Sequence, residues 1–104
     1  DDMMIIRGVN VFPTQIEEII MRHTDLAPYF QCVLTQPGNM VNLTVLIESH
    51  VHLEPEQANA VAHDIQHEIK ATIGTTAQVE VRDPGGIERS VGKARRIVDM
   101  RPKR

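Results

Sequence analysis

The sequence predicts a single small α+β domain over residues 1–104, a βαββαβ sandwich in which two helices cover one face of an antiparallel sheet. Three observations support this class. Apolar and polar residues alternate at 43–47 and at 77–81, as in half-buried strands. Apolar residues recur at helical spacing between 58 and 73. The predicted order of elements, strand, helix, two strands, helix and strand, is typical of such a sandwich.

A short hairpin is expected to precede the sandwich and to lead into the first helix. Two apolar runs are separated by Arg7-Gly8, and a glycine between such runs indicates a tight turn or a bulge, where it permits a positive φ. Pro13 suits the first turn of a helix. Residues 25–28 are interpreted as the loop that follows, because proline disfavours helix in the residue before it. The apolar face of this helix consists of Ile16, Ile19 and Ile20.

The other elements are three strands and a longer helix. Strands are predicted at 30–36 and 42–48, and the Pro-Gly turn between them favours an antiparallel pair. Pro55 near the start of the longer helix and Gly74 after its end are common boundary residues. A last half-buried strand is predicted at 77–82.

The composition predicts a soluble, cytoplasmic protein with an aliphatic core. No stretch approaches the roughly 20 apolar residues of a membrane span, and neither a signal peptide nor a lipidation motif is present. The single cysteine, Cys32, cannot form an internal disulfide, which is typical of a reducing compartment. It lies in an apolar strand and is interpreted as a packing residue. The chain opens on Asp1-Asp2 without an initiator methionine, which indicates a part of something larger.

Charge is distributed unevenly along the chain. Residues 1–88 carry four basic and thirteen acidic side chains, whereas residues 89–104 carry seven basic side chains and one acidic, Asp99. An acidic body with a basic tail favours contact between the tail and an anion. One interpretation is a non-enzymatic βαββαβ binding or regulatory module that recognises an anionic ligand through this tail. A solvated terminus would show the same pattern.

Three common types of site find little support in the sequence. His63 and His67 are four residues apart on the longer helix, but they point away from its apolar face and lack the glutamate of a metalloprotease motif. No predicted strand carries the aromatic pair on which RNA-binding sheets stack bases. No serine, histidine and acid combine into a triad without arbitrary choice. We therefore predict no metal site, no nucleic-acid partner and no independent catalytic centre.

The most distinctive chemical feature is the stretch Arg89-Ser90-Val91-Gly92-Lys93-Ala94. It follows the breaker-rich segment Asp83-Pro84-Gly85-Gly86. Lysine is most often a solvated surface residue, but loop residues carry function more often than framework residues do. Lys93 is therefore the leading candidate for a functional side chain.

Two separated stretches together resemble the adenylate-forming acyl-CoA ligases, and more narrowly their phenylacetate-CoA ligase branch. The first is DDMMIIRGVNVFPTQIE at 1–17, and the second is IERSVGKA at 87–94. The first is the more specific, because VNVFP at 9–13 is similar to the phenylacetate branch rather than to acyl-CoA synthetases in general. The resemblance implies the small C-terminal domain of such a ligase, without its large N-terminal domain.

The resemblance further implies a two-step reaction. A carboxylate, here an aryl acid similar to phenylacetate, attacks the α-phosphate of ATP to give an acyl-adenylate and pyrophosphate, and the thiol of coenzyme A then displaces AMP. ATP with Mg²⁺ and coenzyme A are substrates bound mainly by the large domain, so the chain alone is expected to bind none of them and to be inactive. In such enzymes the small domain is a mobile lid that presents a different face in each of two poses.

Particular residues match positions of the family. Lys93 matches the adenylation lysine, whose ammonium meets the substrate carboxylate and the nucleotide oxygens, and Arg89 and Gly92 support its loop. Asp1 matches the hinge at which backbone torsions change between poses. The loop that lines the pantetheine channel in the thioester-forming pose is matched by Arg7, Gly8 and Val9. We infer in addition that the basic tail favours the phosphates of coenzyme A or ATP.

The chain departs from the family pattern in three places. The glycine-arginine pair that usually precedes the hinge is missing because the chain starts at Asp1, Ile5 replaces a common lysine, and Glu88 replaces a frequent proline. The last change leaves the entry to the lysine loop less rigid than usual. The sequence names neither the acid that is activated nor the oligomeric state, so a homodimer of the complete enzyme stays open.

Overall fold

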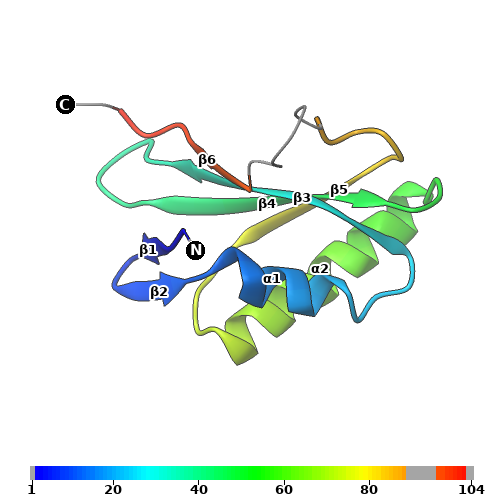
Figure 1. Cartoon of the computed structure of the whole chain (residues 1–104), viewed down its shortest axis with the longest axis horizontal. Helices are drawn as coiled ribbons and strands as arrows, with labels where there is room; N and C mark the ends of the chain where they lie inside the picture. Colours follow the sequence, from blue (N-terminus) through cyan, green and yellow to red (C-terminus); the bar gives the residue numbers. More distant parts are fainter. Residues whose placement is uncertain (1, 89–95, 103–104) are drawn as a thin grey trace.

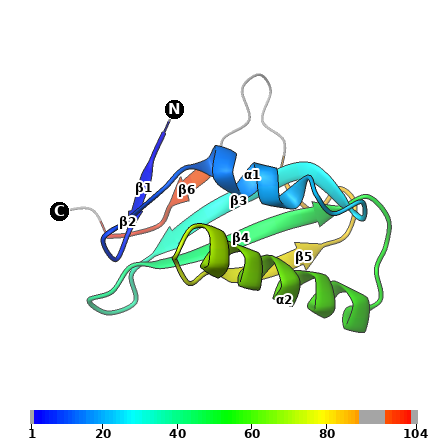
Figure 2. The ribbon, with the colours of Figure 1, turned by 90° about the horizontal axis from the view of Figure 1, so that it is seen from below.

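Two helices and a four-stranded sheet form two layers, and a two-stranded hairpin lies beside them (Figure 1). The computed structural model describes residues 2–88 and 96–102. Figure 2 shows both helices on the same face of the sheet. The α+β class, the initial hairpin and the helices on one face are therefore confirmed. The elements are β1 (Met4–Ile6), β2 (Val9–Val11), α1 (Pro13–Ile20), β3 (Leu26–Thr35), β4 (Asn42–Ser49), α2 (Pro55–Thr72), β5 (Gln78–Arg82) and β6 (Ile97–Asp99).

The sheet has the strand order β5-β4-β3-β6. The predicted antiparallel pairing is found in its centre, where Phe30 lies opposite Ile47 and Cys32 opposite Val45. The two outer strands pair in parallel, β5 with β4 and β6 with β3, so the whole sheet is mixed. The parallel sense of β5 follows from α2, because a helical crossover between neighbouring strands returns the chain in its original direction.

The structure corrects the expected loop at 25–28, because β3 already begins at Leu26. Leu26 lies opposite Ser49, and the register then shifts before Phe30. Pro28 falls inside this irregular part. A proline has no N–H to donate to a neighbouring strand and is tolerated where the ladder is interrupted. The proline thus marks a bulged start of the strand rather than a loop.

A mainly aliphatic core fills the space between sheet and helices. Its members from α1 and α2 are the predicted isoleucines, and alternate residues of the strands and of the hairpin complete it. Each such side chain contributes about 1.5–3 kcal/mol when it leaves water. Those at most 3% exposed include Met4, Ile6, Val11, Ile16, Ile19, Ile20, Phe30, Cys32, Leu34, Leu43, Val45, Ile47, Ile65 and Ile69.

Cys32 is confirmed as a packing residue. Its side chain is 0% exposed in the middle of β3. Burial raises the pKa of the Cys32 thiol to about 12, against the opposing effect of the Arg96 charge. The thiolate required for a nucleophile is therefore strongly disfavoured.

Both ends of α2 agree with the predicted boundaries. Pro55 is its first residue, and the N–H of Gly74, at a φ of 88°, donates to the carbonyls of Ile69 (3.2 Å) and Lys70 (3.1 Å). This helix is the longest in the described part of the chain, yet no helix there is both long and apolar enough to cross a membrane.

Candidate functional site

The tip of the β1–β2 hairpin is formed by Arg7 and Gly8. Their φ values are 49° and 86°, and Ile6 pairs with Val9 across the turn. Positive φ at both central positions is what a type I′ hairpin turn requires, and it favours glycine at the second. A Cβ on Gly8 would meet no atom within 4 Å. The predicted tight turn is confirmed, and its glycine leaves backbone open at the surface.

The Arg7 side chain ties this tip to the neighbouring β3–β4 connection. Its Nε donates a hydrogen bond to the carbonyl oxygen of Val41 at 3.2 Å, and its Nη2 donates one to Oδ1 of Asn42 at 2.8 Å. Val9, on the other side of the turn, packs against the core. The structure therefore brings Arg7, Gly8 and Val9 together as one braced turn with an exposed tip.

A second structural unit is the loop that leaves β5 toward the lysine stretch. The N–H of Gly86 donates to the carbonyl of Asp83 at 2.8 Å, which closes a turn. A Cβ at Gly86 would lie 2.9 Å from both Arg82 Cβ and the Asp83 carbonyl oxygen, so this turn has no room for a side chain. The segment 83–86, predicted as a loop, is confirmed as one.

The residue after this turn is held by a buried carboxylate. Ile87 is 4% exposed, and its N–H donates to Oε1 of Glu48 at 3.3 Å. Glu48 itself is 4% exposed, although it lies on the sheet face opposite the helices. The chain that leads into the lysine stretch is thus fixed to β4 at residue 87.

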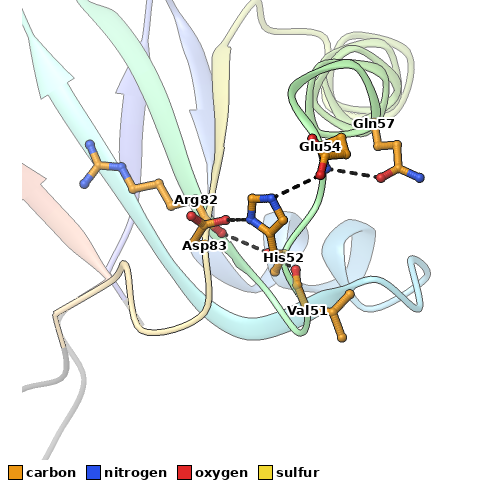
Figure 3. A network of polar contacts seen from close by, with 7 residues as sticks. Val51, His52, Glu54, Gln57, Arg82 and Asp83 are labelled. Carbon is orange, nitrogen blue, oxygen red and sulfur yellow. Dashed lines mark hydrogen bonds and ion pairs between the residues drawn. The ribbon is translucent and has the colours of Figure 1, made fainter.

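His52 contacts the same loop through Asp83, as Figure 3 shows. Its Nδ1 lies 2.9 Å from Oδ1 of Asp83, and its Nε2 lies 3.6 Å from Oε1 of Glu54. The hydrogen bond to Asp83 is the main cause of a pKa for His52 above its ordinary value of 6.5. The side chain of His52 is exposed.

Asp83→Asn is expected to lower the pKa of His52 toward its ordinary value. Because the pKa of His52 is raised in the folded state, its stabilising effect is complete below pH 6.5 and is lost as the pH rises through the folded pKa. NMR titration of the His52 ring protons in the chain and in Asp83→Asn measures the change. Glu54→Gln serves as the control with a smaller shift, because its carboxylate lies farther away. An unchanged His52 pKa in Asp83→Asn would contradict the assignment.

The chain returns to the described part at Arg96, directly before β6. Its Nη2 donates to Oε2 of Glu17 in α1 at 2.8 Å, and its guanidinium carbon lies 4.5 Å from the centroid of the Phe30 ring. Its carbonyl oxygen accepts a hydrogen bond from the N–H of Cys32 at 2.6 Å. Arg96 is therefore tied to both α1 and β3.

Four of the predicted site residues lie outside the described residues, and their roles stay predictions. They are Asp1, Arg89, Gly92 and Lys93. The structure does place the two residues that flank the lysine stretch, Ile87 and Arg96, each with a specific partner.

The described part of the basic tail is paired within the domain. Arg96 meets Glu17, and Arg101 donates two side-chain hydrogen bonds to the carboxylate of Asp99, at 2.9 and 2.8 Å. These two charges are therefore already compensated. Contact between the tail and phosphates would fall mainly to basic residues outside the described ranges.

No metal centre emerges from the described residues. Within 2–88 and 96–102, no three His, Cys, Asp or Glu side chains converge in a way that could hold an ion. His63 and His67 are exposed, with ring centroids 4.9 Å apart, as expected for the outer face of α2.

Sequence reasoning missed the residues that brace the site. Glu48 alternates with the buried residues of β4, which places it on the other face of the sheet, yet it is buried and accepts a hydrogen bond from the N–H of Ile87. In the sequence, Arg96 is one of the seven basic residues of the tail, and nothing there indicates its contacts with α1 and β3. Asn42 contacts Arg7, 35 residues away, and Glu17 contacts Arg96, 79 residues away. No local sequence pattern indicates contacts over such separations.

Comparison with known proteins gives matches over nearly the whole chain. The phenylacetate-coenzyme A ligases of Aromatoleum evansii and Escherichia coli (strain K12) are 49% and 42% identical to it, over 99% and 97% of the chain. Each match covers 24% of the relative, so the chain spans about a quarter of the length of these proteins.

Solved structures agree with this. A domain of phenylacetate-coenzyme A ligase from Bacteroides vulgatus ATCC 8482 superposes with a TM-score of 0.87 at 29% identity, covering 98% of this chain and 95% of that one. A 2-hydroxyisobutyryl-CoA ligase in complex with 2-HIB-AMP and CoA, in the thioesterification state, superposes with a TM-score of 0.85 at 29% identity, over 97% of this chain and 22% of that one.

A protein-family model also matches the chain, and it describes the C-terminal domain of an enzyme. The model described as "AMP-binding enzyme C-terminal domain" matches residues 8–101, which begin at Gly8 of the hairpin tip and include β6 near their end. The chain belongs to the AMP-binding enzyme C-terminal domain family.

Proposed function

We propose that the chain is the mobile C-terminal domain of a larger aryl-acid CoA ligase that acts on phenylacetate or a similar acid. The observation that carries this proposal is the match of nearly the whole chain to one quarter of proteins named phenylacetate-coenzyme A ligase. The remaining three quarters would supply the large N-terminal domain, which is the partner of this one. The same match argues against an independent anion-binding module.

In the first step a carboxylate oxygen of the acid bonds to the α-phosphorus of ATP, and the bond from that phosphorus to pyrophosphate breaks. Two anions must approach each other for this to happen. We propose that the ammonium of Lys93 contacts the substrate carboxylate and the nucleotide oxygens. A preorganised charge of this kind contributes about 3–4 kcal/mol to transition-state stabilisation. Arg89 and Gly92 support the loop that carries it.

In the second step the sulfur of coenzyme A bonds to the acyl carbon, the bond to AMP breaks, and the thiol proton is released. We assign Arg7, Gly8 and Val9 to the wall of the pantetheine channel in this step, and Asp1 to the hinge. The open backbone at Gly8 supports this assignment, because, apart from its two chain neighbours, no atom of the described residues lies within 4 Å of the place that a Cβ would take. A thin thiol arm can therefore run close to the turn.

ATP with Mg²⁺ and coenzyme A would be held mainly by the large domain. In this proposal Mg²⁺ accompanies the nucleotide within that domain. A buried free cysteine and the two substrates favour a cytoplasmic enzyme.

The complete ligase is expected to convert phenylacetate, ATP and coenzyme A into the thioester, AMP and pyrophosphate, whereas residues 1–104 alone are expected to form none. Chromatography of AMP and thioester from both proteins tests this. If the complete ligase forms no AMP with phenylacetate or other aryl acids, the proposal fails. Tight binding of an amino acid or RNA to the isolated chain, measured by calorimetry, would favour the binding module instead.

A further inference from the structure

Arg96 is held more firmly than a basic residue of a solvated tail would be. It makes three contacts with two different elements: an ion pair with Glu17 of α1, a cation–π contact with Phe30 of β3, and a backbone hydrogen bond with Cys32 of β3. Two of these contacts hold the guanidinium group and the third holds the backbone carbonyl. Together they set the position of the chain three residues after Lys93.

The Glu17–Arg96 pair is also better placed than the other ion pair of α1. Its two side chains are 33% and 31% exposed and their atoms lie 2.8 Å apart. Glu18 and Arg22, by contrast, are 75% and 51% exposed and their atoms lie 3.5 Å apart. Short, partly buried, charge-assisted hydrogen bonds are stronger than solvent-exposed pairs, and an aromatic face below the guanidinium adds to them. Glu17 therefore forms a specific contact, whereas Glu18 provides a matched surface control.

The other end of the lysine stretch is fixed as well. Ile87 is buried and its N–H is bonded to the buried Glu48. The two ends belong to opposite edges of the sheet, because residue 87 follows β5 and residue 96 precedes β6 in the order β5-β4-β3-β6. Fixing both ends of a connection reduces the conformations that its middle can adopt. The end at Arg96 is the nearer one to Lys93 along the chain.

We propose that Glu17 and Arg96 are positioning residues for the adenylation step. They hold residue 96, which follows the lysine stretch, against α1 and β3. In this proposal the Lys93 ammonium therefore samples fewer positions before it contacts the reacting carboxylate and phosphate. Small misplacements of a reacting group cost up to about 100-fold in rate. This inference rests on the proposed role of Lys93. It assigns a catalytic consequence to an ion pair that lies on the helix side of the sheet.

The test uses Glu17→Gln in the complete ligase, with Glu18→Gln as the matched control. Glutamine keeps the length of the side chain and an oxygen acceptor but removes the charge. We expect the adenylation rate of Glu17→Gln to fall about 10- to 100-fold, with the KM for ATP nearly unchanged. Thioesterification from preformed acyl-adenylate should keep its rate in the same variant. Glu18→Gln should retain both rates, and Arg96→Lys should fall between wild type and Arg96→Ala.

A double variant separates positioning from general damage to the fold. In a Lys93→Ala background, Glu17→Gln should lower the residual adenylation rate no further, because residues that act as a unit are not additive. A further loss in that background, or equal loss of both half-reactions in Glu17→Gln alone, would overturn the inference. So would full adenylation activity in Glu17→Gln. If Lys93→Ala itself keeps adenylation, the proposed function of the lysine fails, whatever Glu17→Gln shows.

Discussion

Replacement of Lys93 by alanine in the complete ligase should lower the rate of acyl-adenylate formation about 100- to 1,000-fold. The expected loss is large because the ammonium acts only where two anions approach each other in a closed, water-poor site. Measurement of ATP–pyrophosphate exchange with phenylacetate reports this half-reaction directly. The second half-reaction, followed as thioester formation from synthetic acyl-adenylate and coenzyme A, should be largely retained, because in the proposed cycle the domain presents another face at that step.

Lys70→Ala is the matched control for this experiment. Lys70 is an exposed lysine in the last turn of α2, and its removal changes the net charge by the same amount. Both half-reactions should keep their rates in Lys70→Ala. Equal loss of the two half-reactions in Lys93→Ala would contradict the role assigned to Lys93.

Gly8→Val should produce the opposite pattern, a loss of about 10- to 100-fold in thioester formation with adenylation retained. Valine at a φ of 86° is strained, and residues forced into such conformations cost about 1–3 kcal/mol. Its side chain would also project from the tip where the pantetheine arm is proposed to pass. Single-turnover measurement of both half-reactions in the complete ligase tests the prediction.

Gly38→Val provides the comparison within the same end of the domain. Gly38 also has open space around its Cα but lacks a positive φ, so a side chain there is tolerated. If Gly8→Val and Gly38→Val had equal effects on thioester formation, the specific role of the hairpin tip would be wrong.

The sequence predicts those elements of the fold in which apolar residues recur at the regular spacing of a helix or a strand. The isoleucines of α1 and the alternation in β4 each describe one buried face, which is buried as predicted, and the centre of the α2 stripe is buried at Ala62, Ile65 and Ile69. The start of β3 and the whole of β6 were missed. Pro28 disguises the former, and β6 has only three residues, which is too short for an alternating pattern to be recognised.

The candidate site likewise has a part that local sequence predicts and a part that it does not. Arg7-Gly8 could be predicted because the conformation of a two-residue turn is set by its own residues. The bracing contacts could not, since Glu48 meets Ile87 and Glu17 meets Arg96 only after the sheet has assembled. Family resemblance supplied the role of Lys93, and nothing in the neighbouring residues alone would have done so.

The strand order has a consequence for the proposed movement of the domain away from its partner. Among residues 2–88 and 96–102, no further strand pairs with the outer strands β5 and β6, and unpaired strand edges can pair with other chains and cause aggregation. β5 carries a Glu80–Arg82 ion pair at 3.4 Å, and β6 ends after three residues where Arg101 folds onto Asp99. Short, charged edges discourage strand addition. In the proposed cycle, the domain can therefore detach and swing without recruiting a second copy of itself.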